Sequence, residues 1–132
     1  MERLEEVVTG YCRRRGAPPP PPREDGSYVL VFDNKYEVRV SPDGRDRMLL
    51  RADLPRLKRD RDRRDTVERL MRINQLLIGR KQSTLSIDNA LDTPFLYDLV
   101  PVETVDPDSS YRSITGFVNE VAAFYKALER TH

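Results

Sequence analysis

The chain has 132 residues, enough for one domain that buries roughly two thirds of its extended-chain surface. Hydrophobic residues make up 38% of it and charged residues 34%, so we expect a small core or an oligomer. The formal net charge of +1 gives no overall attraction to nucleic acid or to an anionic membrane. The single cysteine, Cys12, cannot form an internal disulfide, and neither a signal peptide nor a membrane-spanning run is evident. We therefore expect a soluble, cytoplasmic protein.

The first predicted element is a short amphipathic helix from Glu2 to about Arg15. Its apolar residues recur at i, i+3, i+4 and i+7, namely Leu4, Val7, Val8 and Tyr11. Five prolines at residues 18–22 then form a stiff, extended segment that can join neither a helix nor a central strand. Such a segment can be a ligand for an aromatic-lined groove. We favour a spacer between helix and sheet, because no second recognition motif flanks the prolines.

From Ser27 onward the apolar residues alternate, which predicts an antiparallel meander of three strands. Turn residues at 33–35 and 41–44 separate the strands. One face is plainly buried and carries Tyr28, Leu30, Phe32, Tyr36, Val38, Val40, Met48, Leu50, Ala52 and Leu54. The other face combines three apolar residues with two charged ones, namely Val29, Val31, Leu49, Glu37 and Arg39. An apolar patch with a charged rim is a candidate binding surface, although a covering helix would explain it equally well.

Residues 56–64 are rich in arginine and lysine, and two aspartates are interleaved with them. A basic run of this kind is sometimes a nucleic-acid contact, with Tyr28 or Tyr36 as stacking platforms. Here the aspartates neutralise part of the charge and no aromatic residue lies in the run. We therefore interpret residues 56–64 as an exposed charged loop and keep a nucleic-acid-binding module as the alternative function.

The next predicted element is a helix from Asp65 to Gly79, with Asp65 and Glu68 as a capping box and Gly79 as the C-terminal cap. Val67, Leu70, Met71, Asn74, Leu77 and Ile78 form one stripe, and Ile73 and Leu76 fall on an adjoining face. A helix with two apolar faces needs two partners, so we expect one face on the sheet and the other on a second subunit. The predicted dimer interface comprises Leu70, Ile73, Asn74, Leu76 and Leu77.

Two more strands and a last helix complete the pattern. Leu85 and Ile87 alternate with polar residues in a fourth strand, and residues 95–99 alternate in a fifth. The last helix has a wide apolar stripe, made of Ile114, Phe117, Val118, Val121, Phe124, Tyr125 and Leu128. The order of helix, three strands, helix, two strands and helix predicts one α+β domain over residues 1–132, with an antiparallel sheet and its helices mainly on one side.

Catalytic patterns are missing from the sequence. The one histidine is the last residue, His132, and Cys12 has no other histidine to activate it. No glycine-rich phosphate loop and no metal-ligand spacing is present. We expect no enzyme activity, no catalytic residue, no cofactor and no metal.

The order and length of these elements resemble the class I chaperones of bacterial type III secretion, the Tir-chaperone-like family. The residues that carry the resemblance are the strand Asp25-Gly26-Ser27-Tyr28-Val29-Leu30-Val31-Phe32-Asp33, the helix segment Leu70-Met71-Arg72-Ile73-Asn74, the strand Leu85-Ser86-Ile87-Asp88 and the last helix. The similarity covers the chain from Asp25 to Leu128 through degenerate apolar patterns.

The resemblance implies a cytoplasmic homodimer, joined through its central helix, that binds the extended N-terminal segment of a secreted effector and keeps it ready for secretion. The client would add strand-like pieces to the sheet and place apolar side chains in surface grooves. The candidate effector-binding residues are those that the predicted packing of helices on the sheet leaves least covered, with the charged residues beside them. They are Val7, Tyr11, Val29, Val31, Glu37, Arg39 and Leu49.

Overall fold

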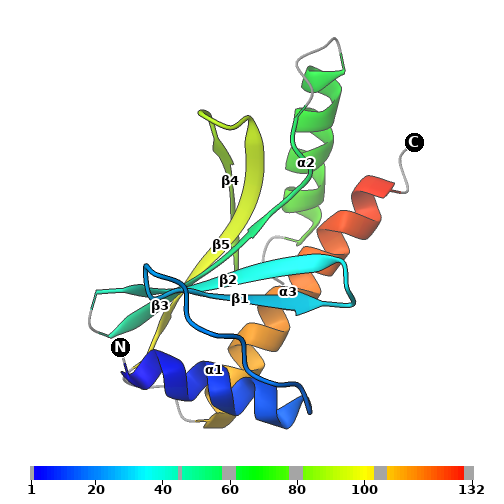
Figure 1. The fold of residues 1–132 in the computed structure, drawn as a ribbon. Coiled ribbons are helices and arrows are strands. Elements are labelled where there is room, and N and C mark those ends of the chain that lie inside the picture. Colours follow the sequence, from blue (N-terminus) through cyan, green and yellow to red (C-terminus); the bar gives the residue numbers. More distant parts are fainter. Residues whose placement is uncertain (1, 45, 58–61, 78–81, 103–106, 130–132) are drawn as a thin grey trace.

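The computed structural model describes residues 2–44, 46–57, 62–77, 82–102 and 107–129 (Figure 1). The elements are α1 (Glu2–Arg14), β1 (Tyr28–Phe32), β2 (Tyr36–Asp43), β3 (Arg47–Asp53), α2 (Arg63–Leu77), β4 (Thr84–Asp88), β5 (Thr93–Pro101) and α3 (Pro107–Glu129). Their order confirms the predicted α+β arrangement. Residues 17–23 between α1 and β1 lie in neither a helix nor a strand, as their prolines require.

All neighbouring strands of the five-stranded sheet are antiparallel, and their spatial order is β1-β2-β3-β5-β4. The first three strands form the predicted meander, and β5 returns to lie beside β3. The sheet therefore has two edges, β1 on one side and β4 on the other. Cross-strand pairing places Val29 opposite Arg39, Arg39 opposite Arg51 and Arg51 opposite Tyr97, so these residues form one row across four strands.

The turns follow from residues that tolerate a positive φ. Asp33 and Asn34 have φ values of 56° and 53° in the β1–β2 turn, where short polar side chains are among the few that fit. The predicted turn at residues 41–44 is wrong in its position, because β2 continues to Asp43. Pairing with β1 stops at Val40, so Pro42 lies where β2 has a partner on only one side and its missing N–H is tolerated. The chain turns just after, at Gly44.

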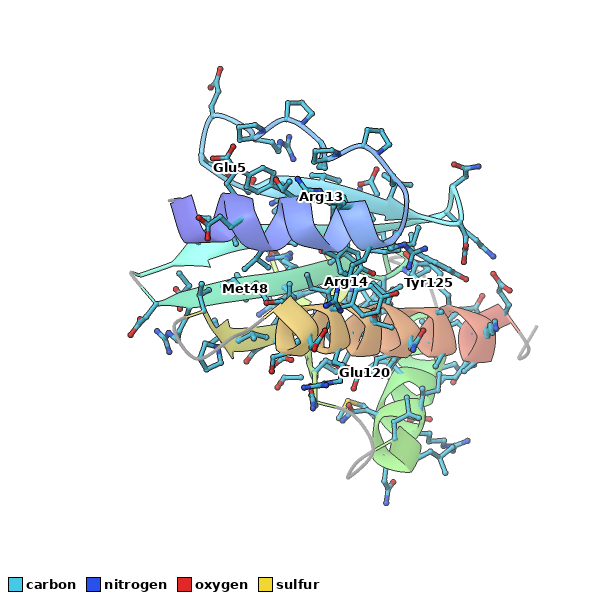
Figure 2. The ribbon with its side chains drawn as sticks, turned by 90° about the horizontal axis from the view of Figure 1, so that it is seen from below. Glu5, Arg13, Arg14, Met48, Glu120 and Tyr125 are labelled. Carbon is cyan, nitrogen blue, oxygen red and sulfur yellow. The ribbon has the colours of Figure 1, made fainter. Side chains whose placement is uncertain are left out.

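Two helices cover one face of the sheet, and the core lies between these helices and that face (Figures 1 and 2). Seen from below, α1 and α3 lie side by side beneath the strands, and α3 contacts β2, β3 and β5. The predicted stripe of α3 is confirmed, with Ile114, Phe117, Val121 and Phe124 almost completely buried. From the sheet, the core receives Tyr28, Leu30, Phe32, Tyr36, Val38, Val40, Met48, Leu50, Ala52, Leu96 and Val100.

Helix α2 differs from the prediction at its start and in its packing. It begins at Arg63, so Asp65 lies in the first turn and is not the N-cap. The Thr66 N–H instead donates to the Asp62 carbonyl oxygen at 2.9 Å. The expected cap at Gly79 lies outside the described residues. The helix packs mainly against α3 and not mainly on the sheet, and in Figure 1 it stands at one end of the molecule.

The charged run at residues 56–64 is not a single loop. Arg63 and Arg64 belong to the first turn of α2, because the helix starts two residues earlier than predicted. Arg63 Nη1 donates to Asp92 Oδ1 at 2.8 Å, and only 8% of the Asp92 side chain is exposed. Arg63 therefore joins α2 to the segment before β5. Residues 58–61 of the run lie outside the described residues.

Candidate binding surface

No helix lies over the outer face of the sheet among the described residues, which leaves the face opposite α1 and α3 open (Figure 1). Val29, Val31, Glu37, Arg39 and Leu49 all lie on this face, as the alternation predicted. Val31 is 57% exposed, and Val29 and Leu49 are half-buried. The alternative of a covering helix is therefore wrong for these five residues, and they do form an apolar patch rimmed by charge.

Strand β5 adds residues to this face that the sequence reasoning missed. Phe95, Tyr97 and Leu99 point outward, since their neighbours Leu96 and Val100 are buried in the core. Leu99 is 42% exposed and lies opposite Leu49 in the ladder. The alternation of β5 indicated two faces. It did not reveal which one is covered, because both faces contain large apolar residues.

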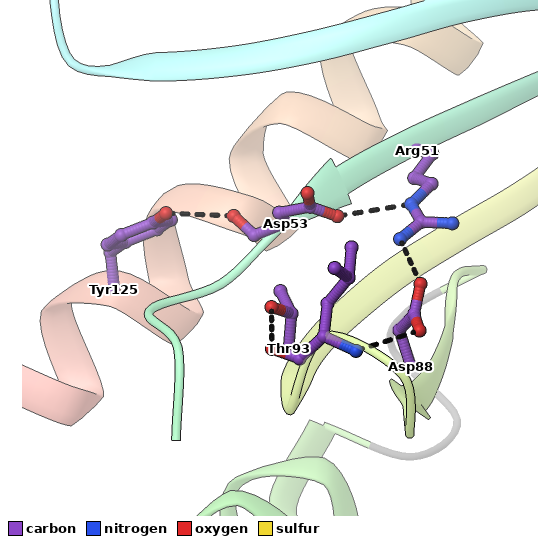
Figure 3. Close-up of polar contacts among 6 residues, drawn as sticks. Arg51, Asp53, Asp88, Thr93 and Tyr125 are labelled. Atoms are coloured by element: carbon purple, nitrogen blue, oxygen red, sulfur yellow. Dashed lines mark hydrogen bonds and ion pairs between the residues drawn. The ribbon is translucent and has the colours of Figure 1, made fainter. Parts of the chain in front are cut away.

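Arg51 holds the centre of the outer face together (Figure 3). Its Nε donates to Asp53 Oδ1 at 3.1 Å, and its Nη2 lies 3.5 Å from Asp88 Oδ2 on β4. The guanidinium carbon lies 3.9 Å from the centre of the Phe95 ring, the geometry of a cation–π contact. Arg51 thus links β3, β4 and β5, and its stacking on Phe95 covers part of an otherwise exposed aromatic ring.

A hollow of about 300 Å³ lies at the β2–β3 part of this face. Its lining mixes apolar stems with charges of both signs, namely Arg23, Val29, Lys35, Glu37, Arg39, Arg51, Asp53, Leu54 and Tyr125. Burial raises the pKa of the Tyr125 phenol, whose hydroxyl donates to the Asp53 carbonyl oxygen at 2.8 Å. The hollow therefore offers both donors and acceptors to a polar backbone.

The predicted site residues of α1 lie elsewhere, against the opposite face of the sheet. Tyr11 was expected to be uncovered, but only 3% of it is exposed. Its ring lies 6.1 Å from Phe32 and 5.2 Å from Tyr111, because α1 turns its apolar stripe onto the core. Val7 is half-buried at the rim of a hollow of about 600 Å³ between α1 and the start of α3. The expectation that Tyr11 is an uncovered anchor is therefore wrong.

The beginning of α3 is tied to α1 by charge. Arg14 forms an ion pair with Asp108, and its guanidinium carbon lies 5.2 Å from the centre of the Tyr111 ring. The hydrogen bond and the positive charge of Arg14 lower the pKa of the Asp108 carboxyl group. These contacts keep the rim of the α1–α3 hollow in place.

The two groups of predicted site residues meet only at the edge of the sheet. A hollow of about 250 Å³ beside β1 is lined by Tyr11 of α1 and by both Val29 and Val31 of the strand. Residues 17, 18 and 20 form another part of its wall. Among the hollows described here, this edge hollow alone combines α1 with the outer face.

The predicted dimer residues divide between the interior and the surface of α2. Leu70 and Ile73 are buried within the chain, because they face α3, so the expectation that Ile73 faces a second subunit is wrong. Leu77 is half-buried against the core, and Asn74 Oδ1 is buried with no hydrogen-bond partner in the described part of the chain. Leu76 is 77% exposed, as expected, and Met71, predicted for the buried stripe, is 54% exposed on the other flank of the buried residues.

The structure gives no support to the nucleic-acid alternative. Tyr28 and Tyr36, its stacking platforms, are buried on the covered face of the sheet. Within the described ranges, no group of three or more His, Cys, Asp or Glu side chains is placed to hold a metal ion. No described helix is both long and apolar enough to cross a membrane. An open sheet face with apolar anchors, charged rims and edge strands on both sides is suited to binding an extended polypeptide.

Comparison with known proteins agrees with a protein that binds extended polypeptides. A sequence model of the Tir chaperone protein (CesT) family matches residues 8–124, which is most of the chain, and the chain belongs to this family. No curated protein sequence matches it.

Several solved structures share the fold. The structure of the ExsC–ExsE complex is 18% identical, covers 96% of this chain and 94% of its own, and has a TM-score of 0.72. The HopA1–SchA chaperone–effector complex is also 18% identical, with 94% of each chain covered and a TM-score of 0.69. The ExoU–SpcU complex from the type III secretion system of Pseudomonas aeruginosa is 15% identical, with 95% and 99% covered and a TM-score of 0.66.

Proposed function

We propose that this protein is a type III secretion chaperone that binds the extended N-terminal segment of a secreted effector and keeps it soluble and ready for secretion. Membership of the Tir chaperone protein family, through a match over residues 8–124, is the observation that carries the proposal. Two of the similar structures are described as a chaperone–effector complex and as a complex from a type III secretion system. The protein would act in the bacterial cytoplasm, where effectors are made, without catalysing a reaction and without a metal or cofactor.

The outer face and its edges supply the means of binding. An extended segment gains affinity by pairing its backbone with a free strand edge, and it gains specificity by placing alternate side chains in apolar hollows. Val29, Val31, Leu49 and Leu99 would receive apolar side chains, and Glu37 and Arg39 would form the charged rim. Ordering a flexible segment costs conformational entropy, so the contacts must extend over a large area. An open face across a five-stranded sheet provides such an area.

We further propose that the protein works as a homodimer through the exposed side of α2. Leu76 presents a large apolar side chain to solvent at 77% exposure, and a second subunit would cover it. Leu70 and Ile73 would stabilise the helix from inside the protomer and would not touch the partner. The dimer would present two outer sheet faces to one client.

The test is co-expression with the bacterium's own secreted proteins, followed by affinity purification and mass spectrometry. We expect one or a few effectors, and limited proteolysis of the complex should protect a segment within about the first hundred residues of each. Recovery of nucleic acid in place of a secreted protein would contradict the proposal. So would a client that binds only as a folded domain.

A further inference from the structure

Strand β1 forms one edge of the sheet, so one side of its backbone has no strand partner among the described residues. In an antiparallel ladder, every second residue of an edge strand points its N–H and C=O groups away from the sheet. Such an edge is a ready template for pairing with any extended chain, whether a client or a second copy of the same protein. Proteins that stay soluble cover or interrupt such edges.

The polyproline segment lies beside this edge. The edge hollow is lined by four consecutive residues of β1, of which Val29 and Val31 face outward while Leu30 and Phe32 face the core. A single hollow can contact both the outward-facing and the core-facing side chains only if it lies beside one edge of β1. Because β2 pairs with the other edge, the hollow lies at the free edge. Ala17, Pro18 and Pro20 form the outer wall, and the remaining lining residues are Tyr11 and Cys12 of α1 and Arg15 just after the helix.

The segment is pinned at both ends and unbonded between them. The Ala17 N–H donates to the Cys12 carbonyl oxygen at 3.0 Å, and the Arg23 N–H donates to the Ser27 carbonyl oxygen at 2.8 Å. In the part of the chain that the structure describes, no backbone hydrogen bond joins residues 18–22 to β1. Five consecutive prolines have no N–H to donate, so the segment cannot become a sixth strand.

We propose that residues 17–22 are a strap that covers the free edge of β1 in the unoccupied protein and moves aside when an extended client segment pairs with that edge. The client's part in this proposal rests on the proposed function, whereas the covering of the edge does not. Opening the strap breaks no hydrogen bond between residues 18–22 and the strand. It costs only the contacts of the residues that line the hollow, and the pinned ends return the strap to the same place.

Cys12 is a built-in reporter of the opening. It is the only cysteine in the sequence, it is 4% exposed, and it lines the same hollow as Pro18 and Pro20. A thiol reagent reaches it only after a local opening of the hollow, at the strap or at the end of α1, or after unfolding of the whole chain. Burial raises the pKa of its thiol, so all rates have to be compared at one pH.

The experiment measures the rate at which Ellman's reagent modifies Cys12 in the full-length protein. Pro18→Gly with Pro20→Gly removes the two prolines that line the hollow, and Pro19→Gly with Pro21→Gly is the matched control at two exposed prolines. We expect the first pair to accelerate modification about tenfold or more and the control pair less than about threefold, because only the first loosens contacts with the edge. Sedimentation velocity should also show larger assemblies for the first pair.

Equal rates in the two double variants, or no larger assemblies in the first, would overturn the proposal. If the Pro18→Gly/Pro20→Gly variant fails to fold, the urea dependence of Cys12 modification in the wild type still tests the strap. Modification through a local strap opening depends only weakly on low urea, whereas modification that follows the global unfolding curve overturns the strap. Neither measurement uses a client. If effectors are recovered but the Cys12 modification rates are the same in both double variants, the strap proposal alone is refuted. If the Cys12 rates differ as expected but no client is recovered, the proposed function alone is refuted.

Discussion

Asp98 is a carboxylate on the covered face of β5, where most neighbouring side chains are apolar. Loss of solvent raises its pKa to about 6, and the negative charge of Glu120 on α3 adds to the shift. Glu120 itself accepts hydrogen bonds from the backbone N–H groups of Gln82 and Ser83, which anchors the start of β4 to α3. The sequence placed Asp98 in a strand but gave no sign that it faces inward, because aspartate on a strand ordinarily faces solvent.

Replacing Asp98 with Asn should stabilise the protein at neutral pH. The folded-state pKa of about 6 lies above the unfolded value of about 3.9, so the ionised form disfavours folding above pH 6 and this cost disappears as the pH falls toward 4. With solvent screening, we expect a gain of about 1 kcal/mol in unfolding free energy at pH 7.5 and almost none at pH 4. Urea denaturation at both pH values and one protein concentration measures it. An equal gain from Asp43→Asn, where the half-buried carboxylate pairs with Arg47 at 2.9 Å, would contradict this reason.

Arg63 and Arg64 are adjacent in sequence and should differ sharply in their effect on stability. Arg63 pairs with the buried carboxylate of Asp92, whereas Arg64 is 87% exposed and pairs with the half-exposed Glu68 one turn along the helix. Arg63→Ala removes the positive partner of a poorly solvated carboxylate, so we expect a loss of about 1–3 kcal/mol in unfolding free energy. Arg64→Ala should cost less than about 0.5 kcal/mol. Denaturant unfolding of the two variants tests the contrast, which fails if both lose the same amount.

At the level of elements, the sequence predicted the strands of the meander and the stripe of α3 correctly, because their apolar residues alternate or recur against clearly polar neighbours. It failed where both faces of an element are apolar. In β5, Phe95 and Tyr97 are as apolar as Leu96, so the pattern could not indicate which side the helices cover. In α2, Met71 was predicted to be buried but is exposed, and Ile73 was predicted to face a second subunit but is buried. The helix packs on α3, a contact that the local sequence does not indicate.

Helix α2 provides a test that separates folding from assembly. Leu76→Glu puts a charge at an exposed position, so the folded protomer should tolerate it while a dimer interface at Leu76 should not. Leu70→Ala removes a buried side chain and should lower the unfolding free energy by about 2–4 kcal/mol. Light scattering should give twice the chain mass for the wild type and the single-chain mass for Leu76→Glu. A monomeric wild type, or a dimeric Leu76→Glu variant, would rule out this interface.

For the whole molecule, the open outer face predicts where client binding is lost. Val31→Asp should leave the melting temperature nearly unchanged, because Val31 is 57% exposed. It should weaken effector binding by a few kcal/mol, because an apolar anchor then meets an unpaired carboxylate. Leu91→Asp is the matched control, since Leu91 is 54% exposed but lies in the β4–β5 turn, away from Val31. Thermal melts and affinity purification of both variants decide it, and equal loss of client from both would refute the site.

The two ends of the sheet also set what kind of oligomer the chain can form. If both β1 and β4 were bare, the β1 edge of one copy could join the β4 edge of the next. This head-to-tail contact leaves a free edge at each end and has no geometric reason to stop. Residues 17–22 cover one of these two complementary ends. Growth by edge-to-edge addition is then blocked. The edge-to-edge contact that remains, β4 with β4 of a second copy, uses the same surface on both copies and closes after two subunits. A stretch of five prolines thereby favours a finite dimer over a fibre.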